Sequence, residues 1–372
     1  MRGLLFVVAS FSATIFAWGL YGPTLHIGQA GMSTVDGEYA RLRPFVCVGL
    51  AYFAIGVIVP AVLLSTKGEK GAWTTRGAVM SLAAGALGAV GALGIIMAFT
   101  FGGRPSFVMP LVFGGAPVVN SFLTIYWAKR MKEIGPVFLA GLVMVVLGAV
   151  TVLLFKPGPP KPEAVAQAIE VVAAVDPTAG IETTDAGIYG GKFLMQLLSI
   201  ATVVVCWGAY GPVLHHGQAA MQQSRLRPLL CVGLAYFGIA VLVPQLLLSG
   251  PIPEESHYSF LGTIWSLAAG AAGAIGALGI IMAFNFGGRP VYVMPLVFGG
   301  APVVNTFATI IAQGQMDQVS AFFLAGLILV IAGAAMVLVF APKGPPPKKV
   351  ESAEKTTKKE EAEPKQAEES KG

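Results

Sequence analysis

The chain has 372 residues, of which 55% are hydrophobic and 12% are charged, and its net charge is +5. A typical soluble domain is about 25% charged, so this composition argues against a soluble enzyme, and the high hydrophobicity excludes a chain that is disordered throughout. The positive charge does not indicate nucleic-acid binding, because the cations lie in short loops and a mixed-sign tail instead of clustering on a folded surface.

Ten apolar segments follow one another along the chain, and each is long enough to cross a bilayer as a helix. They cover residues 4–25, 44–64, 77–101, 105–127, 134–155, 193–214, 228–249, 259–286, 290–312 and 319–341. None of them contains Asp, Glu, Lys or Arg. We therefore expect an all-α integral membrane protein with ten transmembrane helices.

The second half of the chain repeats the first. Trp18 to His26 returns as Trp207 to His215, and Met109 to Asn120 returns as Met294 to Asn305. Shorter repeats pair residues 41–44 with 225–228, 49–53 with 233–237, 91–99 with 276–284 and 102–105 with 287–290. The duplication predicts a first five-helix repeat over 1–155, a linker over 156–192, a second five-helix repeat over 193–341 and a disordered, charged cytosolic tail over 342–372.

An odd number of spans in each half predicts that the two repeats are inverted relative to each other. The loop charges agree, because the loop with Lys67 and Lys70 has a counterpart with Glu254 and Glu255 and without Lys or Arg. Such divergence follows the excess of positive charge in cytoplasmic loops. It predicts a multi-pass protein of the plasma (inner) membrane with both termini in the cytoplasm.

The ends of the first and sixth spans are the first candidate site. Gly and Pro residues surround Trp18 and Tyr21, and again Trp207 and Tyr210. Such residues break or bend a spanning helix, and breaks are tolerated where protein or a water-filled cavity covers them. In transporters with inverted repeats, interrupted helices of both halves meet at the substrate site. The alternative is an aromatic belt at the membrane surface.

Two asparagines and two arginines are further candidates. Asn120 and Asn305 should face the interior of the bundle, where they could bind substrate hydroxyls or only tie helices together. Arg104 and Arg289, in the repeated Gly-Gly-Arg-Pro hairpins, could form an anion vestibule or anchor lipid headgroups.

Catalytic and metal-binding patterns are absent from the sequence. It shows neither a nucleophile with a base and an acid nor metal-ligand spacing. The three cysteines Cys47, Cys206 and Cys231 lie in apolar segments, where a thiol behaves as a small hydrophobe. We therefore expect no enzyme activity, no metal and no cofactor.

These motifs resemble the drug/metabolite transporter superfamily in its ten-helix, EamA-like form. The resemblance rests on two five-helix halves, a Trp-Gly near the end of each first helix, an Arg before each second helix, and prolines at Pro117 and Pro302. It covers about 300 residues. The sequence departs from the family pattern in having Gln29 and Gln218 where many members carry a Lys, and we include both glutamines among the substrate-binding candidates.

The resemblance implies a secondary transporter of a small polar metabolite that works by alternating access between the two repeats. The alternative is a non-transporting membrane scaffold or sensor that acts through its tail and linker. The expected partners are a small-molecule solute and the lipid bilayer, with no nucleic acid, and a homodimer is left open.

Overall fold

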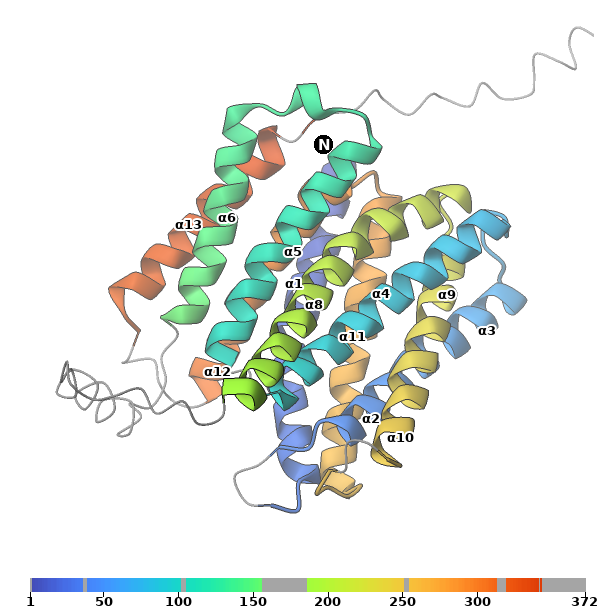
Figure 1. Ribbon diagram of the computed structural model, residues 1–372. Helices are drawn as coiled ribbons and strands as arrows, with labels where there is room; N and C mark the ends of the chain where they lie inside the picture. The colour runs from blue at the N-terminus through green and yellow to red at the C-terminus, as the bar shows by residue number, and fades with distance from the viewer. Residues whose placement is uncertain are drawn as a thin grey trace, which may run out of the picture. The chain divides into compact units, whose positions relative to one another are not determined.

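A computed structural model describes residues 2–35, 39–101, 105–155, 186–250, 254–312, 319–340 and 342. The chain divides into a large unit, Met1–Ala341, and the segment Pro342–Gly372, and the fold below is that of the large unit. Its described residues are almost entirely helical (Figure 1). Most of the predicted linker and nearly all of the predicted tail lie outside the described residues.

The α-helices of the first half are α1 (Arg2–Met32), α2 (Leu42–Phe53), α3 (Val59–Thr66), α4 (Thr75–Thr100), α5 (Pro105–Trp127) and α6 (Pro136–Leu154). Those of the second half are α8 (Ala186–Ala220), α9 (Leu226–Phe237), α10 (Val243–Leu248), α11 (Phe260–Asn285), α12 (Pro290–Ala312) and α13 (Ala321–Phe340). The π-helical turns η1 (Ala54–Ile58) and η3 (Gly238–Leu242) continue α2 into α3 and α9 into α10, and η2 (Met131–Glu133) is a short 3₁₀ turn.

Seven helical segments are long and apolar enough to cross a membrane. They are Gly3–Met32, Leu42–Thr66, Thr75–Thr100, Gly191–Ala220, Leu226–Leu248, Phe260–Asn285 and Pro290–Ala312. Three shorter apolar segments lie in the remaining long helices, at Leu111–Trp127, Pro136–Val152 and Ala321–Val337. The prediction of an all-α chain with several membrane-spanning helices is therefore confirmed.

Helices of one half pack mainly against helices of the other. Counting α2 with α3, and α9 with α10, as one span each, the first span of each half lies on the third and fourth spans of the opposite half. α1 therefore contacts α11 and α12, while α8 contacts α4 and α5. In the same way α2 packs on α11 and α4 on α9, and α6 lies beside α13 at one edge of the bundle (Figure 1). We call α1, α2, α11 and α12 the first set and α4, α5, α8 and α9 the second set.

The two sets meet where α2 crosses α9 and α5 crosses α12. Along the first crossing, Gly49 lies against Ala240, and Gly56 lies against Gly233. Residue numbers rise along one helix as they fall along the other, so α2 and α9 are antiparallel. Glycine lets two backbones approach this closely because it has no side chain.

Matched polar caps begin the third helix of each half. The Thr74 hydroxyl accepts a hydrogen bond from the Gly77 N–H at 3.0 Å, and the Ser259 hydroxyl accepts one from the Gly262 N–H at 3.0 Å. Each hydroxyl satisfies a backbone donor that the first helical turn leaves free. These caps fix the starts of α4 and α11, the helices that receive the two indoles described below.

The helix breaks expected beside the Trp-Tyr motifs are not present. α1 runs through Pro23 and α8 runs through Pro212 without interruption. A proline removes only one backbone hydrogen bond of its helix and bends it, and the surrounding turns keep theirs. The irregular turns instead lie in the second span of each half, at η1 and η3. α8 also begins at Ala186, inside the segment expected to be linker.

Candidate functional site

An aromatic cluster lies where the two sets meet. The first set contributes Trp18, Tyr21 and Tyr52, and the second set contributes the equivalent residues Trp207, Tyr210 and Tyr236. Trp18 lies 6.2 Å from Tyr210 between ring centroids. Four of the predicted site residues, the Trp-Tyr motifs, are therefore brought together at the meeting of the two sets.

Hydrogen bonds to glycine carbonyls hold the two indoles in place. Trp18 Nε1 donates to the Gly273 carbonyl at 3.1 Å, and Trp207 Nε1 donates to the Gly88 carbonyl at 3.3 Å. A glycine one turn further along each acceptor helix, Gly276 or Gly91, lies directly against the indole ring. Each indole thus contacts a helix from the other half of the sequence, and its ring N–H group is satisfied.

The Tyr210 hydroxyl is an unsatisfied buried group of the cluster. Tyr52 and Tyr236 stack with ring centroids 3.8 Å apart and rings 2° from parallel. The Tyr210 and Tyr236 rings both lie against Gly88, and the Tyr52 hydroxyl lies against Gly273. Tyr21 packs against the same core cluster. Within the described residues, the Tyr210 hydroxyl is fully shielded and has no hydrogen-bond partner. Leaving a buried polar group unpaired costs about 1–3 kcal/mol. A bound molecule that forms a hydrogen bond with this hydroxyl would remove that cost.

The predicted asparagines and glutamines have mainly structural contacts. Asn120 is completely buried and donates from Nδ2 to the Pro290 carbonyl at 2.9 Å, which ties α5 to α12. Gln218 is also completely buried and donates from Nε2 to the Ile281 carbonyl at 2.9 Å, which ties α8 to α11. These contacts favour the helix-tying interpretation, although the Asn120 and Gln218 carbonyl oxygens have no partner among the described residues.

The two remaining amides are less buried. Asn305 is half-buried and lies against Gly22, as its counterpart Asn120 lies against Gly211. Gln29 is half-buried near the end of α1. Among the described residues, neither amide side chain makes a hydrogen bond to the aromatic cluster.

The predicted anion vestibule is described only on one side. Arg289 is half-buried just before α12 and interacts electrostatically with His215. Arg104 lies outside the described residues. The vestibule therefore stays a prediction.

A carboxylate that sequence reasoning overlooked caps a helix of the opposite half. Glu69, in the loop before α4, accepts hydrogen bonds from the N–H groups of Arg225 at 2.9 Å and Leu226 at 3.1 Å. Its oxygens also accept from the Ser224 hydroxyl at 2.6 Å and from Arg225 Nε at 3.0 Å. We call this contact the Glu69 cap. The acid satisfies free donors at the start of α9 and complements the positive end of the helix dipole.

The equivalent acid makes the equivalent contact at the start of α2. Glu254 accepts from the N–H groups of Arg41 at 2.9 Å and Leu42 at 2.8 Å, and we call this contact the Glu254 cap. The Arg43 guanidinium donates to the main-chain carbonyl of Glu254 at 3.2 Å and lies over the Tyr258 ring. Each cap therefore lies inside one set while joining the two halves of the sequence.

The Glu69 cap carries more charge pairing than its counterpart. Arg225 Nε lies 3.0 Å and Arg227 Nη1 lies 3.8 Å from carboxylate oxygens of Glu69, whose side chain is only 5% exposed. Burial by itself would raise the pKa of Glu69, but hydrogen bonds from Ser224, Arg225 and Leu226 outweigh it and hold the pKa below its usual value. Glu69 is therefore ionised at neutral pH.

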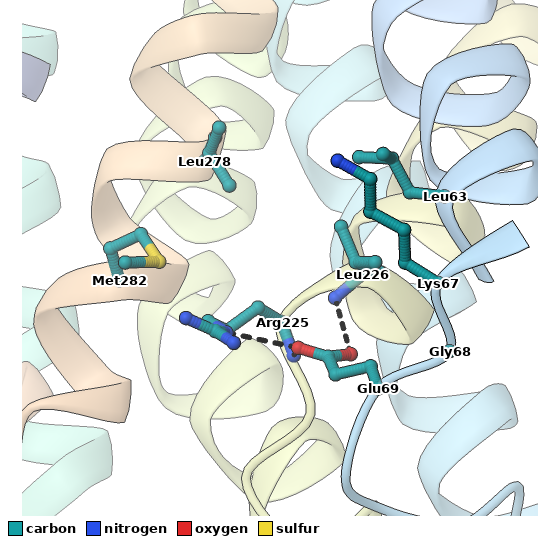
Figure 2. Close-up of a pocket in the computed structure, with 8 residues that line it drawn as sticks. All are labelled: Leu63, Lys67, Gly68, Glu69, Arg225, Leu226, Leu278 and Met282. Atoms are coloured by element: carbon teal, nitrogen blue, oxygen red, sulfur yellow. Dashed lines mark hydrogen bonds and ion pairs between the residues drawn. The ribbon is translucent and has the colours of Figure 1, made fainter.

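A pocket of about 260 Å³ lies beside the Glu69 cap, and Figure 2 shows the side chains that surround it. Leu278 and Met282 of α11 form one wall, and the Glu69 cap with Lys67 forms the other. The pocket thus separates a helix of the first set from the start of α9 in the second set. Sequence reasoning missed it because its lining combines the loop before α4, from the first half, with residues of α9 and α11, from the second half.

Metal binding finds no support in the described part of the chain, where no group of three His, Cys, Asp or Glu side chains could hold an ion. No protein-family model and no curated protein matches the chain. Thirteen chains of solved structures match. One of them, described only as the crystal structure of a protein, has 15% identity and a TM-score of 0.59, with 91% of this chain and 99% of that chain covered. At this identity the likeness shows the fold alone.

Proposed function

We propose that the protein is a secondary transporter of a small polar metabolite, related to the EamA-like drug/metabolite transporters, with ten spans in two inverted repeats. The observation that carries the proposal is the exchange of helices between the halves. It creates two equivalent sets, and each contributes one Trp and two Tyr to the surface where they meet. A site shared equally by two equivalent bodies suits alternating access, in which the bodies rock about a fixed site.

Antiparallel contacts support the inverted orientation. α1 contacts α11 at Gly28 against Ser266 and at Gly276 against Trp18, so residue numbers run in opposite directions along the two helices. α1 and α11 are the first and third spans of their respective halves. If successive spans alternate in direction, the first and third spans of one half point the same way. Because the first span of one half is antiparallel to the third span of the other, the two halves would have opposite orientations.

In this mechanism the two sets, and not the two halves of the sequence, are the moving bodies. The Glu69 and Glu254 caps lie within the sets and would stay closed. The contacts that would break lie between the sets, and they include the Asn120–Pro290 and Gln218–Ile281 hydrogen bonds. Two further hydrogen bonds between the sets lie one in each half of the sequence. Arg41 Nη1 donates to the Thr100 hydroxyl at 3.3 Å, and Asn285 Nδ2 donates to the Gln223 carbonyl at 2.7 Å. Thr100 and Asn285 are equivalent residues in the duplication.

Two crosslinks test this mechanism with matched geometry. In a variant whose three buried cysteines are replaced by alanine, a Gln223→Cys/Asn285→Cys pair joins the two sets within one half. A Thr74→Cys/Ala220→Cys pair joins the two halves within one set, because the Thr74 hydroxyl donates to the Ala220 carbonyl at 3.2 Å. Each pair is bridged with a short bifunctional thiol reagent in proteoliposomes.

We expect the crosslink between the sets to stop solute uptake and the crosslink within a set to leave it close to the uncrosslinked rate. The opposite result would show that the halves themselves move. The uptake screen uses a broad panel of labelled metabolites, and the proposed function fails if no solute enters faster than it enters empty vesicles. The scaffold or sensor alternative concerns the tail and linker, and no described residue favours it.

A further inference from the structure

Four tyrosines lie at the surface between the two sets. Tyr52 and Tyr210 are each 5% exposed and Tyr236 is 7% exposed, so all three are almost completely buried. Tyr21 completes the group from α1. Within the described residues, none of the four hydroxyls makes a hydrogen bond, and the Tyr210 hydroxyl is the one of the four that is also completely shielded. Buried polar groups in native proteins are normally paired, and an unpaired one calls for an explanation such as a bound partner.

The neighbourhood of these hydroxyls has no charge. The six aromatic residues lie in segments without Asp, Glu, Lys or Arg, as do the glycines that accept the indole hydrogen bonds. Among the described residues, no ion pair involves any of the four tyrosines. An ion would therefore leave water without gaining a counter-charge, and this is strongly unfavourable in a low-dielectric interior.

The tyrosine hydroxyls are chemically suited to bind the hydroxyl groups of a solute. A phenol group both donates and accepts hydrogen bonds, as an alcohol does, and four such groups can bind several substrate hydroxyls at once. The indole rings of Trp18 and Trp207 add broad apolar surfaces, while their N–H groups are already bonded to glycine carbonyls. We infer that Tyr21, Tyr52, Tyr210 and Tyr236 form a binding site for an uncharged solute with several hydroxyl groups. This inference rests on the proposed transport function.

Size-matched solutes test the charge of the substrate. The full-length wild-type protein is reconstituted into liposomes. Uptake of glucose and myo-inositol is then compared with uptake of glucuronate, an anion, and glucosamine, a cation. We expect saturable uptake of an uncharged compound and at least about tenfold slower uptake of the charged ones, because the site offers them no counter-charge. Further uncharged polyols and the broad metabolite panel extend the comparison.

Conservative variants test the site itself. Tyr52→Phe and Tyr236→Phe keep the stacked rings and remove one hydroxyl each, so each should raise the half-saturating concentration about five-fold, the effect of one lost hydrogen bond. Tyr126→Phe is the matched control, because Tyr126 is exposed on α5. Elution from size exclusion and the thermal midpoint establish that each variant is folded.

The outcomes separate this inference from the transport function. Saturable uptake of a charged metabolite, without uptake of uncharged polyols, overturns the substrate class and leaves transport standing. Uptake of polyols that the two Phe variants leave unchanged overturns the tyrosine site. If no compound enters faster than it enters empty vesicles, the transport function fails and this inference fails with it.

Discussion

The Glu69 cap offers a quantitative test of how the two halves are held together. Replacing Glu69 by Ala removes the acceptor for two backbone N–H groups at the start of α9, and loss of a helix cap costs about 1 kcal/mol, within a range of roughly 0.5–2. It also removes charged hydrogen bonds with Ser224 and Arg225. Arg225 is 46% exposed, so solvent screens its share. We expect Glu69→Ala to lower the free energy of unfolding by about 2–3 kcal/mol relative to wild type.

The equivalent acid provides an internal comparison. Glu254 caps two N–H groups at similar distances, but its carboxylate forms no ion pair with the described residues, since Arg43 donates to its main-chain carbonyl. Glu254→Ala should therefore cost about 1–2 kcal/mol, less than Glu69→Ala. Glu133→Gln is the control, because the Arg130–Glu133 pair is exposed and such pairs contribute little, about 0–1 kcal/mol.

The assay is reversible unfolding in mixed micelles of mild detergent and SDS, followed by circular dichroism. Glu69→Gln should fall between wild type and Glu69→Ala, because the amide oxygen still accepts one hydrogen bond. A loss at Glu69 no larger than that at Glu133 would refute the reasoning. It would mean that water replaces the carboxylate at the start of α9 without cost.

Acidification and an added methyl group give two further predictions. The folded-state pKa of Glu69 lies below its usual value of 4.5, so its contribution is complete above that pH and is lost as the pH falls through the folded-state pKa. Acidification from neutral pH should therefore lower the unfolding free energy of wild type more than that of Glu69→Gln. Parallel curves of unfolding free energy against pH for the two proteins would contradict this. Gly276→Ala should cost about 1–3 kcal/mol by overpacking, because its methyl group meets the Trp18 indole. Gly135→Ala, with open space around it, should change the thermal midpoint little, and equal effects of the two alanines would exclude close packing at Trp18.

The existence of the helices could be predicted from the sequence, but their partners could not. Apolar runs of about 20 residues suffice to identify spanning helices. In a membrane, however, apolar residues surround a helix on all sides, so the pattern does not mark the face that meets another helix. The sequence does not tell which side chains the glycines of α4 and α11 receive, and the structure shows that these are Trp207 and Trp18.

The candidate site was predictable in part for a related reason. The Trp-Tyr motifs stood out because Gly and Pro surround them in both copies. Tyr52 and Tyr236 belong to a repeated segment without such a mark, and their stacking depends on the crossing of α2 and α9. The acids of the two caps lie 156 and 213 residues from the N–H groups that they bind. Sequence reasoning therefore treated Glu254 only as a loop charge and did not consider Glu69.

The exchange of helices has a consequence for how the protein is made. Trp18 of α1 binds Gly273 of α11, which follows 255 residues later in the chain. At a synthesis rate of about 5–20 residues per second, α1 enters the membrane roughly 10–50 s before that partner exists. The first half alone would leave the α11-binding face of α1 bare.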